Sequence, residues 1–130
     1  MLIKVSEATP RQLDYMVAYI MGATEEWRSD APFLWNGVPC VRDAGHDVRY
    51  SPSTSWWQGG PIIEREGFNR IVKNLSHGYT VSKKLAVLTE DAEVVRWVHG
   101  SGPTPLIAAM RCYVVAKWNH EVEIPEELTA

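Results

Sequence analysis

One segment near the C-terminus constrains the fold more than any other part of this 130-residue chain. Thr104 and Pro105 form a helix start, with a hydroxyl to cap the first turn and a proline at the first helical position. The helix predicted over residues 105–118 carries one charge, Arg111, before Lys117. An apolar surface on nearly every side predicts burial on most faces. This helix must therefore occupy either the centre of the core or the interface of a homo-oligomer.

A second helix is predicted over residues 10–21. Thr9 is placed to cap it, Pro10 to occupy its first position, and Gln12 to complete a capping box. Apolar side chains follow at spacings of three and four residues, which places them on one face of a helix: Leu13, Met16, Val17, Tyr19 and Ile20. Gly22 is a typical helix end.

Shorter segments have the alternation or the β-branched composition of strands. Strands are predicted at residues 33–35, 38–42, 79–82 and 94–99, with extended segments at 2–5, 47–50 and, as an acidic tail, 121–128. The Asn36-Gly37 pair predicts a tight hairpin turn between the first two strands. Residues 89–92 predict a turn, or a single turn of helix, between the last two strands.

The sequence does not distinguish between helix and strand for two segments. Gly60-Pro61 is a possible start for a short helix that ends at Glu66, before Gly67, but Pro61 is equally compatible with the entry to a strand. Residues 68–75 fit a helix or a strand. The elements together predict an α+β fold for residues 1–130, a single domain in which two helices pack on a small, mainly antiparallel sheet.

Charge and cysteine usage limit the environment and the partners. A net charge of −3 and a pI near 5.8 argue against general nucleic-acid binding, which requires a basic surface. No apolar run is long enough to span a bilayer and no export signal is visible, so we expect a cytoplasmic protein without membrane contact. Cys40 and Cys112 are expected to be reduced thiols, although two cysteines leave a disulfide possible.

Catalytic and metal-binding motifs are missing from the sequence. The histidines are dispersed, without the spacing of a metal site: His46, His77, His99 and His120. The serines near residue 53 lack the surroundings of a nucleophile elbow, and Gly59-Gly60 is not followed by the lysine of a phosphate-binding loop. We predict no catalytic residue, no metal and no cofactor, and we favour a non-enzymatic function.

Residues 50–67 combine hydroxyls, glycines and prolines with the adjacent Trp56 and Trp57. Such a composition is typical of a turn-rich loop, but large indole rings need a surface to cover. Two interpretations remain open. The loop either presents a ligand-binding surface, or its tryptophans fill the core of their own domain.

Three blocks of the chain resemble the NinX-like proteins of lambdoid phages, a family of small phage and prophage proteins of unknown function. The blocks are residues 13–18, residues 50–56 with 59–66, and residues 102–114 with 121–128. The resemblance implies a phage-encoded accessory protein that acts inside a bacterium, and it brings no established catalytic residues.

The hydroxyl-rich loop and the start of the second helix predict one concave binding site. Helix N-termini offer unpaired N–H groups to anions, hydroxyls add donors, and tryptophans can stack on a base. Arginine would add charge-assisted hydrogen bonds. The predicted lining residues are Tyr50, Ser53, Thr54, Trp56, Gln58, Thr104 and Arg111.

These residues favour a binder that sequesters a small, phosphate-bearing or nucleotide-like molecule in host counter-defence. The alternative is an interaction module that inhibits a host protein through Trp27, Trp35 and the acidic C-terminal segment, because tryptophans are frequent at interface centres.

Overall fold

Helix α3 (Pro105–Lys117) lies at the centre of the computed structural model, which describes residues 1–76 and 78–129. Its start is the predicted one, because Thr104 Oγ1 accepts a hydrogen bond of 3.1 Å from the Ile107 N–H. Nine of its side chains are buried: Leu106, Ile107, Ala108, Ala109, Met110, Cys112, Tyr113, Val114 and Val115. The central-core alternative is therefore correct, and the fold of the chain itself accounts for the apolar surface of this helix.

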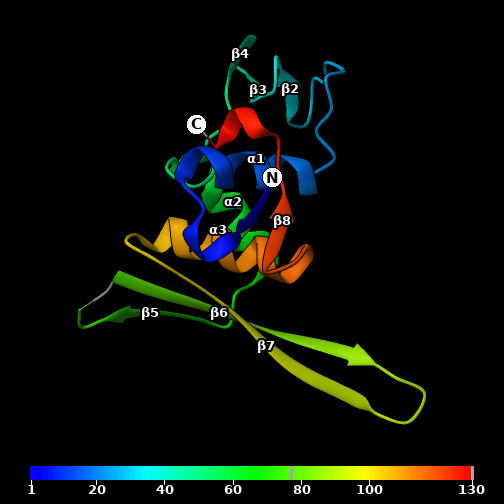
Figure 1. Ribbon diagram of the computed structural model, residues 1–130, viewed down its shortest axis with the longest axis vertical. Coiled ribbons are helices and arrows are strands. Elements are labelled where there is room, and N and C mark those ends of the chain that lie inside the picture. Colours follow the sequence, from blue (N-terminus) through cyan, green and yellow to red (C-terminus); the bar gives the residue numbers. More distant parts are fainter. Residues whose placement is uncertain (77, 130) are drawn as a thin grey trace.

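A three-stranded antiparallel sheet covers one side of α3 (Figure 1). It consists of β5 (Arg70–Asn74), β6 (Gly78–Leu88) and β7 (Glu93–Gly102), in that order. The open segment 68–75 is thus resolved as a strand. The strands predicted at 79–82 and 94–99 belong to β6 and β7, which are much longer than predicted and extend beyond the body of the protein (Figure 1).

Helix α1 (Pro10–Ile20) packs against α3 and has the predicted capping box. The Gln12 N–H donates to Thr9 Oγ1 over 3.3 Å, and the Thr9 N–H donates to Gln12 Oε1 over 3.0 Å. The Gln12 side-chain amide also donates to the Leu128 carbonyl at 2.9 Å. The helix start thereby holds the C-terminal 3₁₀ turn η2 (Glu126–Leu128) against the body.

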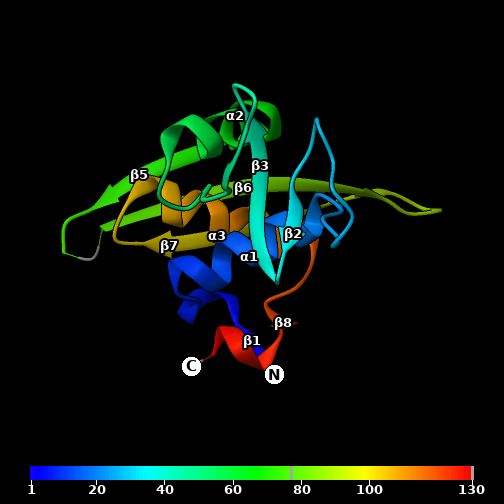
Figure 2. The same ribbon diagram turned by 90° about the horizontal axis from the view of Figure 1, so that it is seen from above.

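Two further antiparallel sheets complete the fold. Strands β2 (Phe33–Trp35), β3 (Val38–Asp43) and β4 (His46–Arg49) form the first, in which Asn36 and Gly37 both have positive φ, as the hairpin prediction requires. Strands β1 (Leu2–Lys4) and β8 (Glu121–Glu123) form the second and bring both ends of the chain together (Figure 2). The tail predicted to be extended therefore contains one strand and the turn η2.

Helix α2 (Trp56–Glu66) begins four residues before the predicted start at Gly60. Trp56 and Trp57 lie on its first turn and are 59% and 78% exposed, so the interpretation that they fill the core is wrong. A Gly-Gly-Pro sequence opposes helix formation, but tertiary packing here overrides that propensity. A Cβ atom at Gly59 would lie 2.2 Å from the Pro52 carbonyl oxygen and 2.5 Å from Leu106 Cδ1, so only glycine permits this contact with α3.

The predicted α+β class is confirmed, with the strands divided among three small sheets instead of one. One 3₁₀ turn, η1 (Val5–Glu7), connects β1 to the segment that precedes α1. Cys40 on β3 and Cys112 on α3 are free thiols. None of the helices in the described ranges has both the length and the apolar character needed to cross a bilayer. His77 lies outside the described residues.

Candidate functional site

The structure distributes the predicted site residues over different parts of the surface. Tyr50 and Gln58 line a hollow between α2 and β3, together with Trp57 and Arg65. Arg111 lines hollows on the other side of the body, beside β7. Thr54 and Trp56 are exposed, Ser53 is buried, and Thr104 caps α3. None of the hollows found among the described residues combines the residues of the 50–58 segment with Arg111.

The α2–β3 hollow has a volume of about 260 Å³ and is electrically balanced. Its charged lining consists of two aspartates and two arginines: Asp30, Asp43, Arg42 and Arg65. Tyr50 is buried, and its hydroxyl donates to the Met21 sulfur at 3.0 Å. The Gln58 side chain donates to the Arg49 carbonyl and accepts a hydrogen bond from the Ser51 N–H. The polar groups of Tyr50 and Gln58 are thus already used within the protein.

Ser53 is held in a buried contact with α1. Its N–H donates to Asp14 Oδ1 at 2.9 Å, and its hydroxyl donates to the Pro10 carbonyl at 3.3 Å. Burial raises the pKa of Asp14 to about 6, against hydrogen bonds from Ser53 and the charge of Arg49, which lower it. This contact anchors the 50–55 segment on α1.

The raised pKa of Asp14 predicts a component of stability that falls as the pH rises. Between about pH 4 and pH 6 the folded protein binds more protons at this carboxyl than the unfolded chain does, so this contribution decreases through that window. Asp14→Asn should remove a change of about 2 kcal/mol in the free energy of unfolding, measured by denaturant unfolding at several pH values. Asp43→Asn, at the exposed end of β3, serves as the control. An unchanged pH profile in Asp14→Asn would contradict the assignment.

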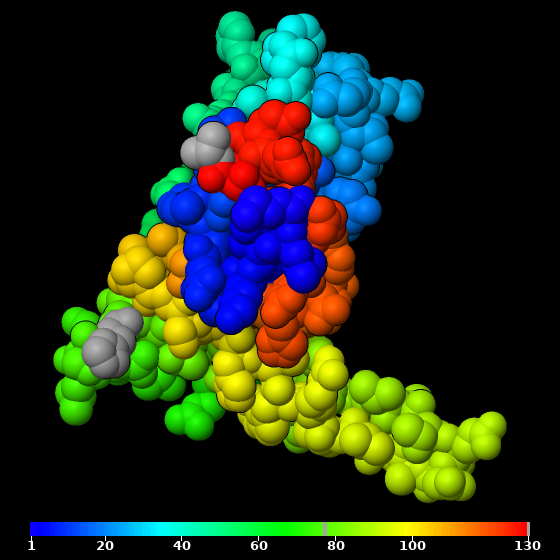
Figure 3. Space-filling model, viewed as in Figure 1, coloured from blue at the N-terminus to red at the C-terminus, as the bar shows by residue number. Residues whose placement is uncertain are grey.

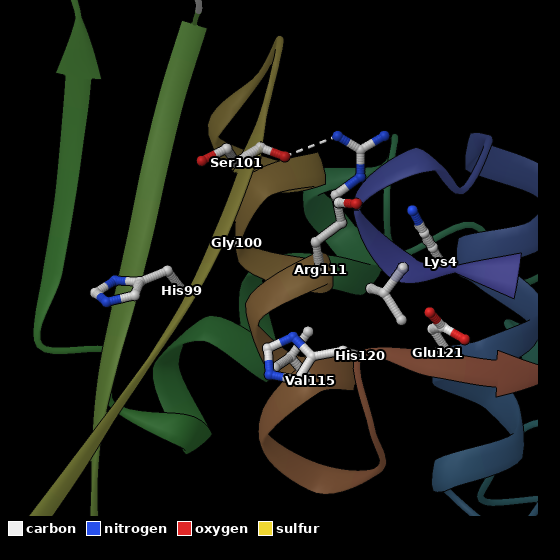
Figure 4. A pocket seen from close by; sticks show the side chains of 10 residues that line it. Lys4, His99, Gly100, Ser101, Arg111, Val115, His120 and Glu121 are labelled. Atoms are coloured by element: carbon white, nitrogen blue, oxygen red, sulfur yellow. Dashed lines mark hydrogen bonds between the residues drawn. The ribbon is translucent and has the colours of Figure 1, made fainter.

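A second hollow, the Arg111 hollow, has a volume of about 380 Å³ and lies between η1, β7, α3 and the start of β8 (Figure 4). Its lining residues are Lys4, Val5, Ser6, His99, Gly100, Ser101, Arg111, Val115, His120 and Glu121. An adjoining hollow of about 480 Å³ shares three of these residues, namely Ser6, Ser101 and Arg111. Arg111 therefore borders two concave surfaces at once.

Arg111 is held by main-chain carbonyl groups. Its Nη1 donates to the Ser101 carbonyl at 2.7 Å and its Nη2 donates to the Ala8 carbonyl at 2.9 Å. Its Nε is buried and has no hydrogen-bond partner in the described part of the chain, and no ion pair there includes this side chain. Burial lowers the pKa of Arg111. The result is a positioned guanidinium whose charge no neighbouring carboxylate neutralises.

Two other basic groups enter the Arg111 hollow from separate elements (Figure 4). Lys4 comes from β1, opposite Glu121 in the register with β8, and His120 immediately precedes β8. The His99 ring turns away from Arg111, because its Nδ1 lies 2.7 Å from Ser82 Oγ on the neighbouring strand (Figure 4). The hollow is thus lined by the basic side chains of Arg111 and Lys4, the carboxylate of Glu121 and the imidazole of His120.

Lys4 and His120 could not be assigned to a site from the sequence. They lie at opposite ends of the chain, and only the pairing of β1 with β8 places them together. An isolated lysine in a short strand is normally solvated and gives no local signal. Arg111 did give a signal, because it is the one charge inside an otherwise apolar helix.

The family model described as "Bacteriophage P22, NinX" matches residues 4–117, which is most of the chain. The match includes the N-terminal and middle blocks of the resemblance and residues 102–114 of the third, and the predicted family is confirmed. No match was found among curated proteins.

Proposed function

This chain belongs to the bacteriophage P22 NinX family and is a phage accessory protein, and from that premise we propose that it binds a small phosphate-bearing molecule. The binding site is the Arg111 hollow. Inside the bacterial host, the bound molecule is a nucleotide-like signal that the protein withdraws from a defence response. Sequestration of this kind requires only binding and no catalytic group.

The observation that carries the proposal is the uncompensated guanidinium of Arg111. Two main-chain carbonyls hold it in place, and a guanidinium has five N–H donors, of which these contacts use two. Carbonyl acceptors leave the positive charge intact, whereas a carboxylate partner would neutralise it. A fixed, planar cation beside a concave surface suits phosphate oxygens, because arginine binds them with charge-assisted hydrogen bonds.

The surroundings of Arg111 support the same ligand class. Lys4 adds a second cation, and the His120 imidazole adds a further hydrogen-bonding group. A volume of about 380 Å³ lies in the range of small-molecule sites. Val115, which is 8% exposed, adds a small apolar surface to the wall of the hollow.

We predict that Arg111→Lys weakens phosphate binding at least tenfold, because an ammonium keeps the charge but loses the planar pair of donors, and one charged hydrogen bond is worth about 1.5–3 kcal/mol. Isothermal titration calorimetry with inorganic phosphate, AMP, cyclic AMP and ATP measures the effect. Arg96→Lys, on an exposed part of β7, is the matched control. The proposal is rejected if the native protein binds none of the four, or if Arg111→Lys binds as the native protein does while melting at the same temperature.

A second candidate function is supported by exposed tryptophans. Trp27, Trp35, Trp56 and Trp57 are each more than half exposed. Trp57 lines the α2–β3 hollow, and the Arg42 guanidinium lies 5.8 Å from the ring of Trp27. Exposed aromatic side chains beside arginines are typical of protein–protein interfaces. In this function the protein inhibits a host factor, and its indole fluorescence changes with that partner but not with phosphate ligands.

A further inference from the structure

The outer halves of β6 and β7 form an arm that extends from the body of the protein (Figure 3). The arm consists of residues 83–88 paired with residues 93–98. Its turn is well formed, because the Thr89 N–H and hydroxyl both donate to the Ala92 carbonyl. Within the described residues, β5 pairs with β6 only as far as Ser82, and the Lys84 N–H donates to Asn69 Oδ1 at 2.8 Å; beyond that contact neither edge of the arm is paired with another strand.

The arm exposes apolar side chains on both faces. Cross-strand partners share a face, which places Val87 with Val94 on one side and Ala86 with Val95 on the other. The exposed fractions are 51% for Val87, 84% for Leu88, 50% for Val94, 45% for Val95 and 44% for Trp97. A two-stranded ribbon without a covering layer is marginally stable in water, and open apolar edges invite another strand. The arm therefore has the properties of an interface.

The distribution of charges along the arm indicates which partner it binds. Its tip is acidic, with Glu90, Asp91 and Glu93, and its base is basic, with Lys84 and Arg96. None of these five side chains belongs to an ion pair found in the described part of the chain. If a second arm of the same sequence runs in the opposite direction, the acidic tip of each arm lies beside the basic base of the other. This charge pattern is complementary to itself.

We propose that this arm binds the arm of a second copy of the chain, antiparallel across a twofold axis. A twofold interface uses the same surface on both subunits, and each charge contact then occurs twice. Strand pairing of the arms occupies one open edge of each ribbon, and face-to-face packing covers the apolar residues of one face. This interface is separate from the Arg111 hollow and from the central helix α3, so its failure would leave the proposed anion binding unaffected.

Reversal of the charges tests the arrangement. One variant combines Glu90→Lys, Asp91→Lys and Glu93→Lys, and a second combines Lys84→Glu with Arg96→Glu. Each should be monomeric where the native protein is dimeric, with a dissociation constant raised at least about tenfold, because each reversal brings like charges together twice. An equimolar mixture should form a heterodimer, because the reversed tip of one variant then faces the reversed base of the other, while the second contact joins an unaltered base to an unaltered tip. Analytical ultracentrifugation measures all these species.

A control variant has the same change of net charge as the tip variant, but away from the arm. It combines Glu26→Lys, Glu126→Lys and Glu127→Lys at exposed positions. It should remain dimeric. A native protein that is monomeric at all concentrations overturns the proposal, as expected if a host protein covers the arm instead. Reversal variants that stay dimeric, or a mixture that forms no heterodimer, also overturn it, because the contact would then lie on another surface or in another orientation.

Discussion

Replacement of Gly100 by alanine should destabilise the protein by about 4 kcal/mol or more, the range of the most damaging single substitutions. Gly100 is the residue of β7 at which the sheet comes closest to α3. A Cβ atom there would lie 2.2 Å from the Cys112 nitrogen, 2.4 Å from the Ala108 oxygen and 2.9 Å from the Arg111 carbonyl carbon. All three are main-chain atoms of the central helix, which cannot turn aside as a flexible side chain can. The strand and the helix would have to separate, with loss of packing along both.

Chemical denaturation monitored by circular dichroism measures this effect. Gly60→Ala is the matched control, because a Cβ atom at this helical position meets no atom within 4 Å. That change should stabilise the protein by about 0.5–1 kcal/mol, the difference between alanine and glycine inside a helix. Equal stabilities of Gly100→Ala and the native protein would show that α3 and β7 are farther apart than these distances require.

Replacement of Glu66 by alanine should cost about 2–3 kcal/mol. This carboxylate, whose side chain is 9% exposed, lies at the end of α2 and pairs with Arg65, Lys83 and Lys117 at 3.2–3.4 Å. These pairs connect α2 to β6 and α3. Most of the expected loss of stability comes from Lys83. Its side chain is only 16% exposed, and it would keep just the Glu66 carbonyl, at 2.9 Å, and the face of Phe68. A buried ammonium without a carboxylate is expensive, whereas the more exposed Arg65 and Lys117 would return to water.

The same carboxylate predicts a loss of stability in acid. Burial alone would raise the pKa of Glu66, but Lys117, Arg65 and Lys83 outweigh it and hold this pKa below the ordinary value. A lowered pKa in the folded state means that the contribution is present above the ordinary glutamate pKa and disappears as the pH falls through the folded value. Glu66→Ala should therefore lose less stability than the native protein below pH 4. Glu64→Ala, exposed on the same helix, should match the native protein in both stability and pH profile.

The caps and turns were predictable from the sequence because their partners lie within a few residues. Thr9 and Gln12 bond to each other, Thr104 bonds to Ile107, and Asn36-Gly37 forms its turn with its own backbone. Each motif contains both partners of the interaction that stabilises it. The two helices, the hairpins and the α+β class followed from such local chemistry together with apolar periodicity.

The start of α2 was not predictable, because the sequence there opposes a helix. Gly59, Gly60 and Pro61 are poor helix formers, and the contact that favours α2 is with Leu106, which is distant in the chain. Long-range packing also explains why the predicted binding site was not found as one surface. Its predicted lining residues lie on different parts of the protein. The chain places Ser53 against Asp14 and Arg111 against Ala8, both over long sequence separations.

From the sequence it followed that a nearly uncharged helix is buried on most faces, either in the core or in an oligomer interface, that two helices begin at Thr-Pro pairs, and that the chain resembles a phage family. Which polar groups remain available for a partner depended on how the elements pack together. Tyr50, Ser53 and Gln58 already form hydrogen bonds with other residues of the protein. By contrast, Arg111 keeps its charge and the β6–β7 arm keeps its apolar faces exposed. The physical reason is that availability depends on what packs beside a group, and those neighbours come from distant parts of the chain.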